Sequence, residues 1–287
     1  MGAVPHRNSG SSTRCGDDRA CGRGHIPYWT VPFGECATRH QISLLTQHYY
    51  RADGQDPSST AAELVSVDTV LPGECQQLQA AALEIGIPWR MSETNSFYNG
   101  GVSGVSDSYA SALWVTDHLA TIAWNGGSGV NLHGGGNSTG YTPIADNAGV
   151  VVGARPEFYG ALLFTLFGQG EMLTTSVSAG GLNVTAYSVQ PGSGGVNMLL
   201  VNKGSTQKLQ ASVSFGQSVQ QATLLQMTAP GLTSTSGVTI QGASVNVDGS
   251  FAPGTPYAAP QVTGNVVNCY VPSLSAVLLQ VSWLQSF

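Results

Sequence analysis

The sequence predicts an α/β segment over residues 41–170, followed by an all-β segment over residues 171–287. In the first segment, short apolar strands alternate with helical patterns. In the second, apolar and polar residues alternate with a period of two, and turns rich in Gly, Pro and Ser separate the runs. Charged residues are also sparse there, since Glu171, Lys203, Lys208 and Asp248 are the only ones after residue 157.

The α/β segment begins with a strand over residues 42–50, which runs into a polar, aromatic tip. A helix is predicted next, because apolar residues recur at helical spacing before Gly86, which suits a helix end. These residues are Leu78, Ala81, Ala82 and Ile85. The second strand covers residues 87–93 and ends at Glu93.

The same alternation continues through residue 167. A second helix is expected from an N-cap at Ser106 to a stop at Gly126 and Gly127. A third strand covers residues 129–133, and Pro156 opens a third helix over residues 157–167. The order βαβαβα predicts parallel strands joined by crossover helices.

The all-β segment is predicted to be an antiparallel sandwich. Along one run, Leu209, Ala211, Val213 and Phe215 face one way and the intervening polar residues face the other. Similar runs cover residues 182–189, 196–201, 222–227, 238–247 and 276–283.

Composition excludes several classes of protein. The net charge of −6 and the lack of a basic stripe argue against nucleic-acid binding. The longest apolar runs are much shorter than the roughly 20 residues that span a bilayer, and the start of the chain lacks an apolar signal core. Charged residues make up only 9% of the chain, against roughly 25% on average, which is typical of secreted proteins.

The five cysteines do not have the spacing of a zinc site, so we expect no metal and no cofactor. They are Cys15, Cys21, Cys36, Cys75 and Cys269, and their odd number leaves the disulfide pairing open. Sequons at Asn137 and Asn183 are candidate glycosylation sites in an exported protein. Residues 1–40 are rich in Arg and Cys without a hydrophobic period, and we interpret them as irregular.

Polar and aromatic side chains gather at the carboxyl ends of the three predicted strands, where parallel α/β folds carry their active sites. They are His48, Tyr49, Tyr50, Glu93, Asn95, Phe97, Tyr98 and His133. One carboxylate surrounded by aromatic rings and imidazoles suits a saccharide, because aromatic faces pack on sugar rings while polar tips bind hydroxyl groups. Each Tyr or His alone would equally suit a capping role, and the convergence of three strand ends favours a site.

Several motifs in this order resemble glycoside hydrolase family 79, the family of microbial and fungal β-glucuronidases and heparanase. The motifs are Ser92-Glu93-Thr94-Asn95-Ser96-Phe97-Tyr98, Gly104-Val105-Ser106-Asp107, Ala112-Leu113-Trp114, Gly129-Val130-Asn131-Leu132-His133-Gly134-Gly135 and Gly140-Tyr141-Thr142-Pro143-Ile144. The resemblance covers residues 41–170, and the all-β segment resembles the C-terminal β-domain of that family.

The resemblance implies that residues 41–170 are the sixth to eighth strands of a (β/α)8 barrel. Glu93 corresponds to the nucleophile of a retaining enzyme, and Tyr49 to the tyrosine that orients it. The expected substrate-binding residues are Tyr98, Gly140, Tyr141, His133 and Asn95. The implied substrate is a glucuronide or a glucuronic-acid-bearing glycan or proteoglycan, and the full-length family member would be extracellular.

The sequence departs from the family at the acid/base residue. Retaining hydrolysis needs a second carboxyl roughly 5 to 5.5 Å from the first. The family supplies it from an Asn-Glu pair on the fourth strand, and this chain has no Asn-Glu pair. Asp53, Asp56 and Asp146 are better interpreted as turn formers. The simplest explanation is an incomplete or incorrectly predicted gene product with translated non-coding sequence at its start, which would be inactive alone.

Two other classes of function remain open: a carbohydrate-binding module without catalysis, and a structural or interaction role of the β-sandwich. A serine hydrolase is disfavoured, because no G-x-S-x-G elbow follows a strand with suitable His and Asp partners. The three glycines after His133 lack the Gly-Lys-Ser/Thr ending of a phosphate loop.

Overall fold

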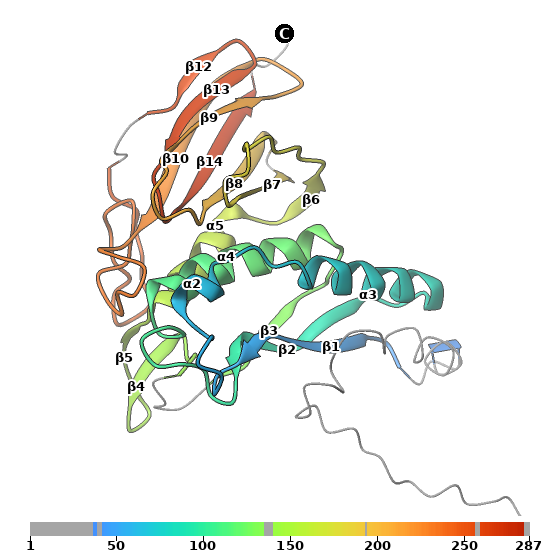
Figure 1. The fold of residues 1–287 in the computed structure, drawn as a ribbon. Helices are drawn as coiled ribbons and strands as arrows, with labels where there is room; N and C mark the ends of the chain where they lie inside the picture. The colour runs from blue at the N-terminus through green and yellow to red at the C-terminus, as the bar shows by residue number, and fades with distance from the viewer. Residues whose placement is uncertain (1–36, 39–41, 135–139, 193, 256–258, 284–287) are drawn as a thin grey trace, which may run out of the picture.

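The computed structural model describes residues 37–38, 42–134, 140–192, 194–255 and 259–283. A layer of helices separates a small parallel sheet from two antiparallel sheets (Figure 1). Apart from residues 37 and 38, the segment predicted to be irregular lies outside the described residues. No helix in the described part is long and apolar enough to cross a membrane.

The parallel sheet confirms the predicted order of strands. It contains β1 (Leu45–Asp53), β2 (Trp89–Tyr98) and β3 (Val130–Leu132), with β2 in the centre and both pairings parallel. Strand β1 begins three residues later than predicted and continues to Asp53, because it keeps pairing with β2 as far as Tyr98. Because of this extension, β1 and β2 both end beyond their predicted ends, at Asp53 and Tyr98.

The helices are α2 (Ala61–Leu64), α3 (Leu71–Ile85), α4 (Tyr109–Trp124) and α5 (Pro156–Phe167). As predicted, Gly86 ends α3 in the left-handed conformation (φ 71°) and Pro156 opens α5. Helix α4 begins later than predicted, with Ser108 as its N-cap. The Ser106 hydroxyl instead accepts a hydrogen bond from the Val102 amide (2.9 Å) and bonds to the Ser96 hydroxyl (2.8 Å).

The all-β segment contains two antiparallel sheets, and their arrangement as a sandwich stays a prediction. The order in the larger sheet is β11-β10-β14-β8-β7-β6, and in the smaller sheet it is β12-β13-β9. Their bounds are β6 (Gly170–Leu173), β7 (Val184–Pro191), β8 (Val196–Asn202), β9 (Leu209–Ser214), β10 (Val219–Thr228), β11 (Thr239–Ile240), β12 (Gln261–Thr263), β13 (Val266–Val271) and β14 (Ser275–Trp283).

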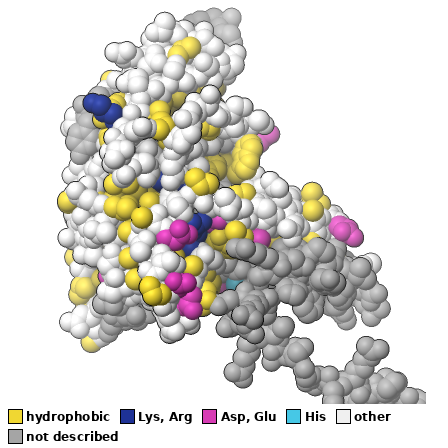
Figure 2. Space-filling view, viewed as in Figure 1, with side chains coloured by type: hydrophobic (Ala, Val, Ile, Leu, Met, Phe, Trp, Pro, Cys, Tyr) yellow, Lys and Arg dark blue, Asp and Glu magenta, His cyan; other side chains and the backbone are white. Residues whose placement is uncertain are grey.

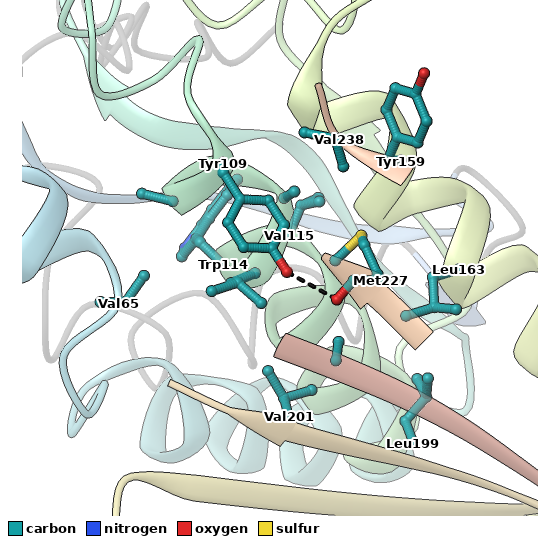
Figure 3. Packing of buried hydrophobic residues seen from close by; sticks show 14 of the residues in the cluster. Val65, Tyr109, Trp114, Val115, Tyr159, Leu163, Leu199, Val201, Met227 and Val238 are labelled. Carbon is teal, nitrogen blue, oxygen red and sulfur yellow. Dashed lines mark hydrogen bonds between the residues drawn. The ribbon is translucent and has the colours of Figure 1, made fainter. Parts of the chain in front are cut away.

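Alternation along β8 shows why the larger sheet is apolar on both faces. Leu199 and Val201 belong to the core shared with α4 and α5, whereas Met198 and Leu200 belong to the core shared with the smaller sheet. Helices α4 and α5 are therefore covered by a sheet on one side. The Tyr109 hydroxyl crosses this boundary and donates to the Met227 carbonyl at 2.9 Å (Figure 3).

Several parts of the fold differ from the sequence prediction, among them α2 and β6, which were not predicted. The hairpin of β4 (Ile144–Asn147) and β5 (Val150–Ala154), and the strands β12 and β13, were not predicted. The predicted strand over residues 238–247 is reduced to β11, because Gln241 has a positive φ of 53° and the chain turns back from Ile240 to pair with Ala243.

Candidate active site

An irregularity in β2 sets the position of Glu93. Gln47 of β1 pairs with Met91, but the next residue, His48, pairs with Glu93, so β2 has one residue more than β1 at Ser92. The pairing with β3 shifts after Met91 as well. Such a bulge re-aims side chains within a strand. It places Glu93 opposite His48, in the middle of β2 and level with the end of β3.

Glu93 is partly exposed and contacts two side chains of β1. The Tyr50 hydroxyl donates to Oε1 at 2.8 Å. Oε2 lies 3.4 Å from His48 Nδ1, an atom that is buried and makes no hydrogen bond with the described residues. About a third of the Glu93 side chain (34%) is open to solvent, so a ligand can reach the carboxylate.

The prediction that Tyr49 orients Glu93 was wrong. Adjacent residues of a strand point to opposite faces of the sheet, and the Tyr49 side chain lies in the core beneath α3. Its hydroxyl donates to Asp68 Oδ2 at 2.6 Å. Tyr50, the next residue, is the tyrosine that holds Glu93.

Tyr50 joins Glu93 to two of the predicted substrate-binding residues. His133 Nδ1 lies 3.1 Å from the Tyr50 hydroxyl and 2.8 Å from the Tyr141 hydroxyl. Tyr98 packs edge-on against the Tyr50 ring, with 6.1 Å between the ring centroids. The structure therefore brings Glu93, Tyr98, His133 and Tyr141 together around one tyrosine.

Electrostatics keeps the phenols of this cluster protonated. Burial raises the pKa of Tyr50, and its hydrogen bond to Glu93 raises this pKa further. Burial also raises the pKa of Tyr141. Both hydroxyl groups are therefore neutral hydrogen-bond donors at physiological pH.

Asn95 does not face the open site, which corrects its assignment as a substrate-binding residue. It is fully buried (0% exposed), and Nδ2 donates to the carbonyl oxygens of His133 (2.8 Å) and Tyr141 (3.1 Å). Asn95 thus holds the backbone at two site residues, His133 and Tyr141. Phe97, another of the predicted tip residues, is also fully buried in the core.

A glycine makes room for Tyr141. Gly101 has a φ of 76°, and a Cβ there would lie 2.9 Å from Tyr141 Cδ1. Gly140, predicted to offer its N–H to a substrate carboxylate, is buried next to Tyr141, and that role stays a prediction.

Other predicted residues lie away from Glu93. Asp53, Asp56 and Asp146 each accept a hydrogen bond from a backbone N–H two or three residues ahead, which confirms them as turn formers. Arg90 and Arg155 bond to carbonyl oxygens of the backbone, those of Val130 and Thr142.

The sequon and cysteine predictions are tested only in part. Asn183 Nδ2, the atom that a glycan would modify, donates to the Val65 carbonyl at 2.8 Å, and Asn137 lies outside the described residues. Cys75 and Cys269 are buried free thiols, and the other three cysteines are not described. In the described ranges, no group of three or more His, Cys, Asp or Glu is placed to hold a metal ion.

No family model matches the chain. It is 28% identical over 128 residues to a β-glucuronidase of Aspergillus niger, a match covering 42% of this chain and 24% of the relative. It is 34% identical over 138 residues to a β-glucuronidase of Neurospora crassa, covering 44% of this chain and 24% of the relative. The chain resembles fungal β-glucuronidases.

The fold is similar to that of glycoside hydrolases. A 4-O-α-L-rhamnosyl-β-D-glucuronidase from Fusarium oxysporum, solved as a Rha-GlcA complex, matches with a TM-score of 0.69 and 19% identity, covering 89% of this chain and 56% of the other. A GH51 arabinofuranosidase from Xanthomonas axonopodis pv. citri matches with a TM-score of 0.62 and 17% identity over the same shares. The chain spans about a quarter of the length of the curated relatives it matches.

Several functional candidates were missed by sequence reasoning. Tyr50 stood among the strand-end residues but was not chosen over Tyr49. His48 was likewise not assigned a role. Charge is low on the face shown in Figure 2, where acidic and basic side chains are few. On this face, the charged side chains therefore do not mark a site.

Proposed function

We propose that this chain carries the nucleophile of a retaining β-glucuronidase of glycoside hydrolase family 79, acting on glycans that contain glucuronic acid. The observation that carries the proposal is the Tyr50–Glu93 hydrogen bond between two neighbouring parallel strands. The similarity to fungal β-glucuronidases supports the choice of sugar. In this proposal β1 to β3 are the last three strands of a (β/α)8 barrel, and the whole protein is secreted.

Glu93 attacks the anomeric carbon of the glucuronosyl residue, and the bond to the leaving oxygen breaks. The product of this step is a glucuronosyl ester of Glu93, which water then hydrolyses with net retention. Tyr50 donates to Oε1 and so stabilises the ionised carboxylate, leaving Oε2 to act as the attacking atom. His48, 3.4 Å from Oε2, lines the same side.

The substrate carboxylate is bound by neutral donors. Tyr50 has one hydroxyl proton and gives it to Glu93, so its oxygen can only accept from His133. With Nδ1 protonated, His133 donates to the oxygens of both Tyr50 and Tyr141. The Tyr141 hydroxyl also interacts with Tyr50 and with the Gly100 backbone, so a ligand would compete with Tyr50 for its proton.

In this proposal the second carboxyl of the retaining mechanism is missing from this chain, which has no Asn-Glu pair. Within the described part of the chain, the groups that contact the Glu93 carboxylate are Tyr50 and His48. Neither is a carboxylic acid, so protonation of a poor leaving group is not provided at this position.

A substrate whose leaving group needs no protonation tests the nucleophile directly. We expect dinitrophenyl β-glucuronide to release dinitrophenolate once per chain and to leave a glucuronosyl adduct on Glu93, located by peptide mass spectrometry. Slow hydrolysis of the ester makes this adduct accumulate. Glu93→Gln should abolish the burst, and Glu171→Gln, an exposed carboxylate of β6, should leave it unchanged.

Two results would overturn the proposal. One is an adduct on another residue. The other is saturable binding of glucuronic acid without any burst, which would identify a carbohydrate-binding module instead of an enzyme.

A further inference from the structure

His48 is a second side chain of β1 that faces the Glu93 carboxylate. His48 and Tyr50 are two residues apart on the strand, so their side chains lie on the same face of the sheet. The Tyr50 hydroxyl donates to Glu93 Oε1 at 2.8 Å, and His48 Nδ1 lies 3.4 Å from Oε2. The two oxygens of Glu93 therefore face two different side chains of the same strand.

The contact between His48 and Glu93 indicates which ring nitrogen carries the proton. Nδ1 is buried and makes no hydrogen bond of good geometry with any described residue. A lone pair on Nδ1 would face the lone pairs of the carboxylate, whereas a proton there can be donated to Oε2. The 3.4 Å separation exceeds that of a usual hydrogen bond, and such bonds are often long in ligand-free active sites and shorten when the ligand binds. The geometry therefore favours a proton on Nδ1.

The other ring nitrogen of His48, Nε2, is then an acceptor. In a neutral imidazole with its proton on Nδ1, Nε2 keeps its lone pair. The His48 side chain is 25% exposed although Nδ1 is buried, so the exposed part of the ring is the edge away from Glu93. Nε2 belongs to that edge and is separated from Nδ1 by one carbon atom. A ligand that reaches Oε2 of Glu93 therefore meets this acceptor close by.

The structure of a sugar determines which of its hydroxyl groups comes nearest to His48. Under the proposed function, Oε2 of Glu93 attacks the anomeric carbon, which approaches to roughly 3 to 3.5 Å before the bond forms. Within the ring, this carbon is bonded to the ring oxygen and to C2, and C2 carries a hydroxyl group. The 2-hydroxyl is therefore the hydroxyl group closest to the attacked atom. Hydrogen bonds to it strengthen in the transition state of glycoside hydrolysis.

We propose that His48 is a specificity-determining residue that binds the 2-hydroxyl of the sugar. Its Nδ1–H donates to Glu93 Oε2, and its Nε2 accepts a hydrogen bond from the 2-hydroxyl. One side chain thus contacts both the nucleophile and the carbon next to the reacting atom, so a sugar without a donor at C2 is disfavoured. Because Glu93 must be the nucleophile for this role, the assignment rests on the proposed function.

Nitrogen-15 spectra of the imidazole rings at alkaline pH test the hydrogen bond to Glu93 without substrate. We expect His48 to carry its proton on Nδ1. His118 is the internal reference for the opposite form: Thr94 gives its hydroxyl proton to the Tyr49 carbonyl, so His118 Nε2, 3.0 Å from Thr94 Oγ1, carries the proton. Glu93→Ala removes the acceptor and should move the His48 proton to Nε2, with no change at His118. A proton on Nε2 of His48 in the wild type overturns the proposal.

Two variants of His48 separate its two hydrogen bonds. The amide nitrogen of asparagine is as many bonds from Cα as Nδ1, and the amide oxygen of glutamine is as many bonds from Cα as Nε2. His48→Asn therefore keeps the donor to Glu93 and loses the acceptor for the sugar. His48→Gln keeps an acceptor for the sugar and loses the donor at the Nδ1 position.

The measurement is the rate at which dinitrophenyl β-glucuronide and its 2-deoxy analogue label Glu93. A 2-deoxy sugar ionises more easily by itself, so the ratio of the two rates is compared between proteins instead of the rates themselves. A hydrogen bond of ordinary strength predicts that the ratio of glucuronide to 2-deoxy labelling is about 2- to 12-fold higher in the wild type than in His48→Asn. His48→Gln should keep the ratio of the wild type.

The labelling ratio distinguishes a failure of this role of His48 from a failure of the proposed function. If both substrates label Glu93 but the ratio is the same in the wild type and in His48→Asn, the role of His48 is overturned and the proposed function stands. If neither substrate labels Glu93 in any of the proteins, the proposed function fails, and the binding of the 2-hydroxyl by His48 fails with it. A ratio that falls in His48→Asn and is kept in His48→Gln supports both.

Discussion

The Tyr50 hydroxyl donates to Glu93 across the first two strands, at 2.8 Å, while the adjacent Tyr49 hydroxyl donates to Asp68 beneath the sheet. Two neighbouring tyrosines thus hold carboxylates on opposite faces. Burial raises the pKa of both phenols. Tyr50 and Tyr49 therefore allow a matched comparison between a phenol at the candidate site and a phenol in the core.

Tyr50→Phe should slow the labelling of Glu93 by dinitrophenyl β-glucuronide. A hydrogen bond to a charged group contributes about 1.5 to 3 kcal/mol, which corresponds to about a 10- to 100-fold change in rate. Tyr49→Phe should leave the labelling rate unchanged and lower the Tm. Equal labelling rates in wild type and Tyr50→Phe would show that this bond does not activate Glu93.

Acid should destabilise the protein through His118. Burial lowers the pKa of His118 to about 4, although Asp68 and Asp117 oppose the shift. The unfolded state binds this proton below about 6.5, so folding stability falls as pH drops from there to about 4, by about 3 kcal/mol at most. Chemical denaturation at a series of pH values measures this loss.

The control for this prediction is His118→Gln. Thr94 gives its single hydroxyl proton to the Tyr49 carbonyl (2.5 Å), so His118 Nε2, 3.0 Å from the Thr94 oxygen, must be the donor. A glutamine amide can supply the same donor and does not titrate. The variant should therefore lose less stability over this pH range, and an unchanged loss would assign the effect to another group.

Much of the α/β segment could be predicted from the sequence, because its signals are local. Helix α3 ends at Gly86 and helix α5 begins at Pro156, as predicted from the preference of glycine for helix ends and of proline for helix starts. The prediction that the second strand ends at Glu93 was wrong, because β2 continues to Tyr98 through its pairing with β1. The choice between Tyr49 and Tyr50 could not be made from the sequence, since it depends on which face of β1 is buried and on the extra residue at Ser92.

Other features had no clear sequence signal. Val150, Val151 and Val152 are exposed in β5 and show no period-two alternation, so the hairpin was not predicted. Glu157 follows a proline at the start of a helix, where an acidic residue is normally exposed and interacts with the helix dipole. Its burial depends on tertiary packing, in which α5 lies against α4 and the larger antiparallel sheet.

The ion pair of Asp117 and Lys203 should couple α4 to the larger antiparallel sheet. Lys203 Nζ lies 2.5 Å from Asp117 Oδ2, and the hydroxyl groups of Thr185 and Tyr187 bond to Oδ1. Burial alone would raise the pKa of Asp117, yet Lys203 and these hydroxyl groups keep it below the usual value. Removing one partner of such a buried pair costs about 3 to 5 kcal/mol.

A double-mutant cycle measures this coupling. Asp117→Asn and Lys203→Met should each lower the free energy of unfolding by that amount, and the double variant should lose less than the sum of the two. Losses that add up fully would show that the two charges act independently.

The close packing of α4 against α5 depends on Gly160. A Cβ at this position would overlap the Ala112 carbonyl oxygen and a methyl group of Val115. The Gly160 carbonyl also accepts a hydrogen bond from Thr116 Oγ1 at 3.2 Å. Gly160→Ala should therefore force the helices apart and cost about 1 to 3 kcal/mol, despite the better helix propensity of alanine.

Gly73 of α3 supplies the matched control, because a Cβ there meets no atom within 4 Å. Gly73→Ala should stabilise the protein by up to about 1 kcal/mol, since alanine loses less backbone entropy in a helix. Opposite signs for the two substitutions, measured by urea denaturation, would separate packing from propensity.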